Sequence, residues 1–244
     1  MRRFAQDFRS PRVKGIILFA LFSLSFIGIA QGQTIQPVLS EYRGQASGRF
    51  ELTNDSFYPL NVVLEAESFA VSEDGEITYG PLGSDIHVKF SATSFRIPPK
   101  QSLSVAYQAS ASKLPAWFVV YAGMTGLPVR TSSGLNIQVL LPHTVYLLPK
   151  KDASKNELKI VNASFDKTTQ VVSLEIESES DSFARILATE VRAGKKKMKA
   201  EGFPIYPHKH RRLDVPWQED RVPDVAVFSL RNFTIEAPIT IRTP

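Results

Sequence analysis

Residues 135–139, Leu135-Asn136-Ile137-Gln138-Val139, alternate strictly between apolar and amide side chains. Gly134 precedes this stretch, and Pro142 follows it three residues later. Alternation with period two is the pattern of a β-strand that has one apolar and one polar face. A proline cannot donate a hydrogen bond to a neighbouring strand, so within a sheet it is typical of an edge strand. The stretch therefore predicts an apolar strand at the rim of a sheet, where pairing with another chain is possible.

The first 32 residues differ in composition from the rest of the chain. Five basic residues lie within residues 2–14, and nearly continuous apolar sequence follows over residues 15–30. Small residues then occupy the positions that a signal peptidase reads, and we expect cleavage after Gly32. The apolar run is shorter than the roughly 20 residues that a membrane-spanning helix needs. This favours a cleaved signal peptide over an uncleaved membrane anchor.

The basic charge of the chain is concentrated in this leader. The whole chain has a formal net charge of +5, whereas residues 33–244 contain 24 basic and 23 acidic side chains. A nearly neutral mature chain gives no support for nucleic-acid binding. The chain contains no cysteine, so core burial without disulfides must stabilise the exported protein.

Short segments rich in β-branched and aromatic residues recur along the mature chain, and turn residues separate them. In the first half we expect strands at Gly48–Thr53, Leu60–Ser68, His87–Ala92, Phe95–Ile97, Ser102–Ala109, Ala116–Gly123 and Leu135–Leu148. The polar, proline-led stretch 149–155 is typical of a domain boundary. Beyond it we expect strands at Leu158–Ser164, Val171–Glu177, Arg185–Arg192, Lys197–Lys199, His210–Val215, Val225–Leu230 and Thr234–Arg242. The sequence thus predicts an all-β fold of two tandem antiparallel β-sandwiches, with a signal peptide at 1–32 and domains at 33–148 and 149–244.

Motifs for catalysis and cofactor binding are missing from the sequence. It contains no nucleophile elbow, catalytic triad or paired carboxylates, and no glycine-rich loop that opens a helix. His208 and His210 form a His-x-His pair that can ligate a metal, but three neighbouring basic residues oppose a cation there. The lysines at 195–197 favour a solvated hairpin tip over a binding surface for anions. We therefore expect no enzyme activity, no cofactor or metal, no nucleic-acid partner and no small-molecule substrate.

Several segments resemble the PapD-like periplasmic pilus chaperones, in the same order along the chain. Residues 50–55 with Pro59 are similar to a strand of that family that ends in Asn before a proline turn. Residues 95–105 are similar to its proline-containing turn and strand, and residues 114–121 to its Leu-Pro and next strand. Residues 135–149 are similar to the last strand of its first domain and the interdomain proline. The second domain resembles the family more loosely, at Ser180–Phe183, Gly194, Pro204 and Pro207.

The resemblance implies immunoglobulin-like domains and a periplasmic chaperone that binds pilin-like secreted subunits. In that family the last strand of the first domain lends alternate apolar side chains to a subunit whose own sandwich lacks a strand. The donor residues implied here are Leu135, Ile137 and Val139. An ordinary core strand, with these residues facing their own sandwich, is the alternative. Whether an outer-membrane usher takes over the subunit stays open.

The family's basic pair for the subunit's C-terminal carboxylate has no direct counterpart in this chain. The lysine position of the last strand falls on Pro142, and the first strand, residues 34–39, contains no arginine. The remaining residues for a carboxylate contact are Arg43 and His143, and His143 would have to be protonated. This departure keeps a rival open, a non-catalytic structural or adhesive immunoglobulin-like protein of the cell envelope.

Overall fold

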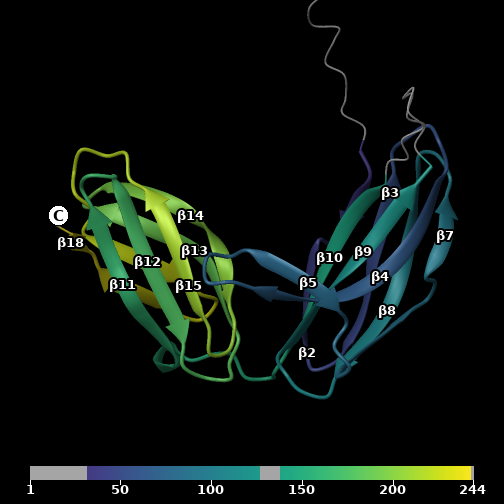
Figure 1. Cartoon of the computed structure of the whole chain (residues 1–244), viewed down its shortest axis with the longest axis horizontal. Coiled ribbons are helices and arrows are strands. Elements are labelled where there is room, and N and C mark those ends of the chain that lie inside the picture. Colours follow the sequence, from purple (N-terminus) through teal and green to yellow (C-terminus); the bar gives the residue numbers. More distant parts are fainter. Residues whose placement is uncertain (1–31, 127–137, 243–244) are drawn as a thin grey trace, which may run out of the picture. The chain divides into compact units, whose positions relative to one another are not determined.

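The computed structural model describes residues 32–126 and 138–242. These residues form two β-sandwiches, which confirms the predicted all-β, immunoglobulin-like fold (Figure 1). Their one helical element is a short 3-10 turn, η2, at Lys155–Glu157. None of the described residues belongs to a helix that is long and apolar enough to cross a membrane. The leader predicted at 1–32 lies outside the described part except for its last residue, and its cleavage stays a prediction.

Strands β1–β10 form the first sandwich, coloured purple to teal in Figure 1. One sheet has the order β1-β3-β8-β6, and the other has the order β2-β10-β9-β4-β5, with β7 paired to β4. The strand bounds are β1 Thr34–Gln36, β2 Leu39–Arg43, β3 Ala46–Asn54, β4 Leu60–Val71, β5 Ile77–Pro81, β6 Ile86–Phe90, β7 Ser94–Ile97, β8 Gln101–Ala111, β9 Ala116–Thr125 and β10 Val139–Leu148. Side chains such as Phe50, Val105, Phe118 and Val145 fill the core between the sheets.

The chain changes sheets at its start, between β1 and β2. β1 pairs antiparallel with β3, whereas β2 pairs in parallel with β10 in the opposite sheet. Pro37 lies between the two short strands. Residues 34–43 therefore contribute an edge to both sheets, and their strand pairing with β10 begins at Leu39.

Asn54 organises the turn that joins β3 to β4. Its side chain is fully buried, and Nδ2 donates to the carbonyl oxygens of Tyr58, Ile97 and Pro98 at 2.8, 3.1 and 3.0 Å. Oδ1 accepts from the backbone N–H and the hydroxyl of Ser56. A buried amide needs partners for its donors and its acceptor. The asparagine at the end of this apolar strand thus fixes the geometry of the following turn through its side-chain hydrogen bonds.

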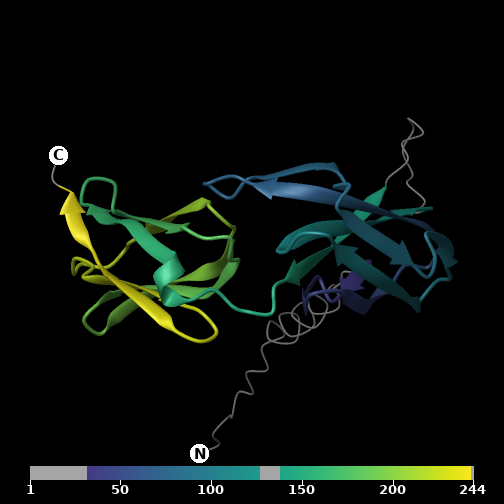
Figure 2. The same ribbon diagram turned by 90° about the horizontal axis from the view of Figure 1, so that it is seen from below.

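Strands β11–β18 form the second sandwich, coloured green to yellow (Figure 2). Its sheets have the orders β15-β12-β11-β18 and β14-β13-β16-β17. The bounds are β11 Leu158–Asp166, β12 Val171–Ser178, β13 Ala184–Ala193, β14 Lys196–Ile205, β15 His210–Pro216, β16 Val225–Ser229, β17 Thr234–Pro238 and β18 Thr240–Arg242. Trp217, Phe165 and Phe228 are fully buried in its core.

Most predicted strands are confirmed, with ends that shift by a few residues. The first strand placed at residues 34–39 is divided in the structure between β1 and the start of β2. The strand β5 was not predicted, because five residues carry little periodicity. The strand predicted at Lys197–Lys199 is longer, Lys196–Ile205. The strand predicted at Thr234–Arg242 is two strands, which join different sheets. The one predicted at Leu135–Leu148 is confirmed from Val139 onward, and residues 127–137 lie outside the described part.

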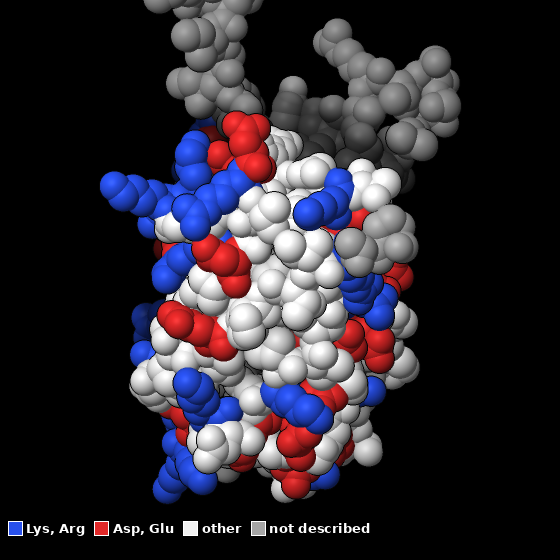
Figure 3. Space-filling model, turned by 90° about the vertical axis from the view of Figure 1, so that its left-hand side faces the viewer, with Lys and Arg blue, Asp and Glu red and all other residues white. Residues whose placement is uncertain are grey.

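Charged side chains of both signs are interspersed on the face shown in Figure 3, around a band of uncharged residues. The basic segments singled out in the sequence take part in ion pairs. Lys196 and Lys197 pair with Glu219 and Glu190 at 2.9 and 3.5 Å. The two histidines contact different carboxylates, His208 that of Asp181 and His210 those of Glu175 and Glu177. Exposed pairs of this kind contribute little to stability.

Candidate functional site

Strand β10 has one neighbouring strand along its first half and two along its second half. β9 pairs antiparallel with the strand from Val139 to Leu147. On the other side, β2 pairs only with Thr144–Leu148. Within the described ranges, Val139–His143 therefore have no hydrogen-bonded strand on the side away from β9 (Figure 1). This segment is an open edge.

The direction of the backbone groups at the open edge follows from one hydrogen bond. The N–H of Thr144 donates to the carbonyl oxygen of Val38 at 2.8 Å, so the backbone groups of Thr144 point away from β9. Successive residues of a strand alternate in this direction, and Leu140 and Pro142 therefore point the same way. Leu140 offers an N–H and a carbonyl to an added strand, whereas Pro142 offers only a carbonyl. The proline sits where its missing N–H breaks no hydrogen bond to β9.

The side chains of β10 alternate between the core and the outer face of the sheet. Val139 and Leu141 are half-buried and pack against the core of the first sandwich. Leu140 points outward and is 56% exposed. It lies opposite Gly123 of β9, which in turn lies opposite Val63 of β4, itself 48% exposed. Leu140 and Val63 thus form an exposed apolar row across the sheet beside the open edge.

Two more exposed apolar side chains lie where β2 reaches β10. Val38, whose carbonyl receives the Thr144 N–H, is 57% exposed, and the next residue, Leu39, is 41% exposed. Leu39 is the register partner of Thr144. The open edge is therefore bordered by apolar surface at the point where β2 begins to cover it, which favours contact with another protein.

Arg43, one of the two residues predicted to contact a carboxylate, already has a carboxylate partner. It ends β2, donates to the carbonyl oxygen of Pro149 at 2.8 Å and pairs with Asp152. Asn232 donates to the other Asp152 oxygen at 3.1 Å. The hydrogen bond from Arg43 holds the pKa of the Asp152 carboxyl below its usual value. A carboxylate from a partner would have to compete with Asp152 for this guanidinium.

His143, the other predicted contact, is enclosed in the core. Its Nδ1 lies 2.6 Å from the Pro37 carbonyl oxygen, and its Nε2 lies 3.0 Å from the hydroxyl oxygen of Tyr107. A carbonyl only accepts, so Nδ1 carries the proton. Burial lowers the pKa of His143, against the opposing effect of the Pro37 hydrogen bond. A neutral, buried imidazole is a poor anchor for a carboxylate, so the geometry argues against this part of the prediction.

No family model matches the sequence, and no curated protein matches it. Solved structures do match. The class 5 fimbriae chaperone CfaA is 12% identical with a TM-score of 0.53, over 86% of this chain and 99% of that chain. The YadV chaperone is 14% identical with a TM-score of 0.53, over 84% of this chain and 97% of that chain. A structure of the Salmonella enterica SafA pilin in complex with the SafB chaperone matches at 12% identity and a TM-score of 0.52, over 85% of this chain and 96% of that chain.

The chain has the fold of the fimbrial chaperones. The resemblance to the PapD-like chaperones is thereby confirmed at the level of the fold, over nearly the whole length of those chains. At 12–14% sequence identity, the roles of individual residues are not transferred from these structures to this chain. The roles of residues in this chaperone fold are therefore argued from the geometry of this chain.

Of the three predicted donors, Val139 alone lies in the described part of the chaperone fold. It is half-buried against its own core, and Leu135 and Ile137 lie within the undescribed residues 127–137. The donor role of the three residues stays a prediction. Sequence reasoning missed Leu140, because Val139-Leu140-Leu141 is apolar on both faces and its period cannot be read there.

Proposed function

We propose that this protein is a periplasmic chaperone for pilin-like subunits, and that it binds a subunit by pairing one of its strands with the open edge of β10. The observation that carries the proposal is the half-covered β10: among the residues that the structure describes, Val139–His143 have no second neighbouring strand in a fimbrial-chaperone fold. Proteins usually cover or charge such an edge. Here apolar side chains border it instead.

The proposed binding mode combines generic and selective contacts. Main-chain hydrogen bonds to Leu140 and to the Pro142 carbonyl give affinity that is independent of the partner's side chains. The predicted donors Leu135, Ile137 and Val139 supply the apolar contacts to the subunit, Val139 through the part of its side chain that its own core leaves exposed. Burying one such side chain contributes about 1.5–3 kcal/mol. Three of them offset much of the cost of ordering a partner strand.

The partner class is supported by what the matching structures contain. One is a pilin bound to its chaperone, and another is a chaperone–tip adhesin complex of fimbriae biogenesis. We infer pilin-like secreted subunits as the clients of this chain, and transfer of the client to an outer-membrane usher belongs to the same proposal. Export by the leader at 1–32 places the protein in the periplasm.

The rival is a structural or adhesive immunoglobulin-like protein of the envelope, which would bind no subunit through β10. Co-expression with a pilin-like subunit from the same genome, followed by co-purification, separates the two functions. We expect Ile137→Asp to abolish retention of the subunit. The matched control is Ile77→Asp, which adds the same charge at an exposed isoleucine of β5, at the far edge of the same sheet. Equal retention by both variants would refute strand addition at β10, and no retention by the wild type would favour the rival.

A further inference from the structure

The chain's own strand β2 and an added client strand would occupy the same side of β10. β2 pairs with Thr144–Leu148 on the side away from β9, and the proposed client strand pairs with Val139–His143 on that side. Two strands cannot pair with the same stretch of one edge, so the client strand must end where β2 begins. The start of β2 is therefore a property of the binding site, and the inference below rests on the proposed function.

The segment before β2 is long enough to cover the open edge, but it lies on the other sheet. Continued upstream in the register of β2, residues 34–38 would lie beside residues 139–143. Instead, Thr34–Gln36 form β1 and pair with β3. Ile35 is buried in the core there, which favours this position. Pro142 disfavours the alternative, because it has no N–H to donate to a strand on its open side.

His143 holds the point at which this segment leaves β10. Its Nδ1 donates to the Pro37 carbonyl oxygen at 2.6 Å, and the next residue, Val38, makes the first hydrogen bond to β10. In a continuing strand, carbonyl groups lie in the plane of the sheet. The His143 side chain lies in the core instead. By turning toward this side chain, the Pro37 carbonyl directs the chain to the opposite sheet.

The His143 ring is itself fixed by aromatic side chains of the opposite sheet. Its centroid lies 5.0 Å from that of Phe50 on β3 and 5.4 Å from that of Tyr107 on β8. Its Nε2 lies 3.0 Å from the Tyr107 hydroxyl oxygen. A ring that is packed in this way in a dense core keeps one orientation, so Nδ1 stays directed at Pro37.

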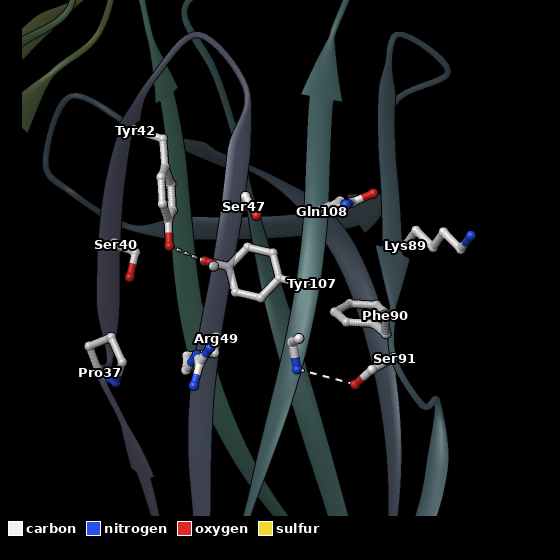
Figure 4. A pocket seen from close by; sticks show the side chains of 12 residues that line it. Pro37, Ser40, Tyr42, Ser47, Arg49, Lys89, Phe90, Ser91, Tyr107 and Gln108 are labelled. Carbon is white, nitrogen blue, oxygen red and sulfur yellow. Dashed lines mark hydrogen bonds between the residues drawn. The ribbon is translucent and has the colours of Figure 1, made fainter.

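Tyr107 also contacts β2 itself. Its hydroxyl donates to that of Tyr42 at 3.0 Å, and Figure 4 shows the two hydroxyl groups directed toward each other. Gly48 leaves room for this contact, because a Cβ there would lie 2.1 Å from the Tyr42 hydroxyl oxygen. The residue before β2, Pro37, and a residue within it, Tyr42, are thus connected to the same buried hydroxyl, Pro37 through His143.

The crossing from β1 to β2 has open space on one side. β1 pairs only with Glu51–Thr53 of β3, and within the described residues no strand pairs with Ala46–Phe50 on the side away from β8. A pocket of about 600 Å³ is lined by Pro37 and Tyr42 together with residues of β3 (Figure 4). Packing on that side therefore restrains the crossing little, and the hydrogen bond from His143 carries more of the restraint.

We propose that His143 is a positioning residue for the strand-addition site: by holding Pro37 in the core it fixes where β2 begins, and thereby where a client strand on the edge of β10 ends. Val38 and Leu39, both exposed, then meet the end of the client strand. His143 acts here through the Pro37 backbone and not through a charge on its ring, which distinguishes this role from a carboxylate contact.

Amide hydrogen exchange of the free protein tests this role without a subunit. His143→Leu removes the donor to Pro37, so the Thr144 N–H should exchange at least about tenfold faster as its bond to Val38 opens. Tyr146, whose backbone points the same way, is the internal control and should keep its protection. His143→Gln keeps a donor and should restore slow exchange at Thr144. Unchanged exchange at Thr144, an equal rise at Tyr146, or no rescue by glutamine would overturn the proposal.

The wild type offers a measurement that does not depend on the folding of a variant. The Nδ1 proton of His143 should give a slowly exchanging NMR signal with cross-peaks to protons of Pro37 or Val38. A ring proton that exchanges rapidly, or one without these cross-peaks, would equally overturn the proposal.

Crosslinking to a client tests where the added strand ends. The chain contains no cysteine, so Val38→Cys introduces a single thiol at an exposed position beside β2. A pilin-like subunit from the same genome carries single cysteines along the strand that becomes protected in the complex. We expect crosslinking at one position of that strand when residue 143 is histidine or glutamine, and at several neighbouring positions in His143→Leu.

The outcomes separate the role of His143 from the proposed function. Crosslinking at one and the same position in all three proteins would refute the positioning role. A wild type that binds no subunit would refute strand addition at β10, and the exchange of Thr144 in the free protein would still decide whether His143 fixes the start of β2.

Discussion

The N–H of Thr144 donates to the carbonyl oxygen of Val38 at 2.8 Å, and this bond marks the point where β2 begins to cover β10. On one side of it, Thr144–Leu148 lie between two strands. On the other side, the backbone groups of Leu140 and Pro142 that point away from β9 have no strand partner within residues 32–126 and 138–242. The boundary between the covered and the open part of one strand thus defines the proposed binding edge.

The alternation of backbone direction predicts opposite effects of proline at adjacent positions. The Leu140 N–H points to the open side, so Leu140→Pro should lower the free energy of unfolding by less than about 1 kcal/mol beyond Leu140→Ala. The Leu141 N–H points to β9, so Leu141→Pro should cost about 2–4 kcal/mol beyond Leu141→Ala. Urea denaturation measures all four variants. The reverse order would show that the alternation is assigned wrongly.

Aspartate substitutions test the side-chain faces in the same way. Val139→Asp places a charge against the core and should lower the free energy of unfolding by about 2–3 kcal/mol. Leu140→Asp replaces an outward side chain and should change it by less than about 1 kcal/mol. Thermal or urea denaturation of the purified variants measures both changes in the free energy of unfolding. A Val139→Asp variant as stable as the wild type would contradict the packing of Val139 against the core.

Because His143 is buried, we expect the folded protein to lose stability in acid. Burial lowers its pKa in the folded protein below about 6.5, the value for the unfolded chain, so the unfolded chain binds more protons between those two pKa values. The stabilisation is fully present above about pH 6.5 and is lost as the pH falls, by up to about 1.4 kcal/mol per unit. Urea denaturation between about pH 8 and pH 5 measures this slope.

The matched variants for this test are His143→Gln and His208→Gln. Glutamine keeps a donor for the Pro37 carbonyl but does not titrate, so His143→Gln should flatten the slope. His208 is largely exposed, and its replacement should leave the slope unchanged. An unaltered slope in His143→Gln would show that His143 does not cause it.

The buried amide of Asn54 predicts a graded loss of stability. Asn54→Ala leaves the carbonyls of Tyr58, Ile97 and Pro98 without their side-chain donor and should cost about 2–4 kcal/mol. Asn54→Asp should cost more, because a buried carboxylate would face three carbonyl oxygens. Chemical denaturation checks both variants, with Ser56→Ala as the smaller change in the same turn. An aspartate variant as stable as the wild type would refute this account of the turn.

Much of the fold could be predicted from period-two alternation, because in β3, β8 and β12 buried residues alternate with more exposed ones. The change of sheets between β1 and β2 could not, since it depends on pairing with β10, about a hundred residues away. The open edge was anticipated from Pro142. Its extent could not be predicted, because it is set by where β2 begins.

Single residues explain what was missed at the site. His143 carries no local sign of burial, because its partner Tyr107 lies on a different strand of the opposite sheet. Gly48 did carry a signal, since a glycine inside a strand often marks a close approach of other groups. That close approach is the pair of Tyr42 and Tyr107, which only the packed structure brings together.

Hydrogen exchange at the Leu140 amide tests the central claim most directly. Amide exchange is compared between the free protein and its complex with a pilin-like subunit, residue by residue, with Leu141 as the internal control. Strand addition at the open edge predicts that the Leu140 N–H exchanges rapidly in the free protein and becomes strongly protected in the complex, while Leu141 is protected in both. A complex in which Leu140 exchanges as rapidly as in the free protein would contradict the account.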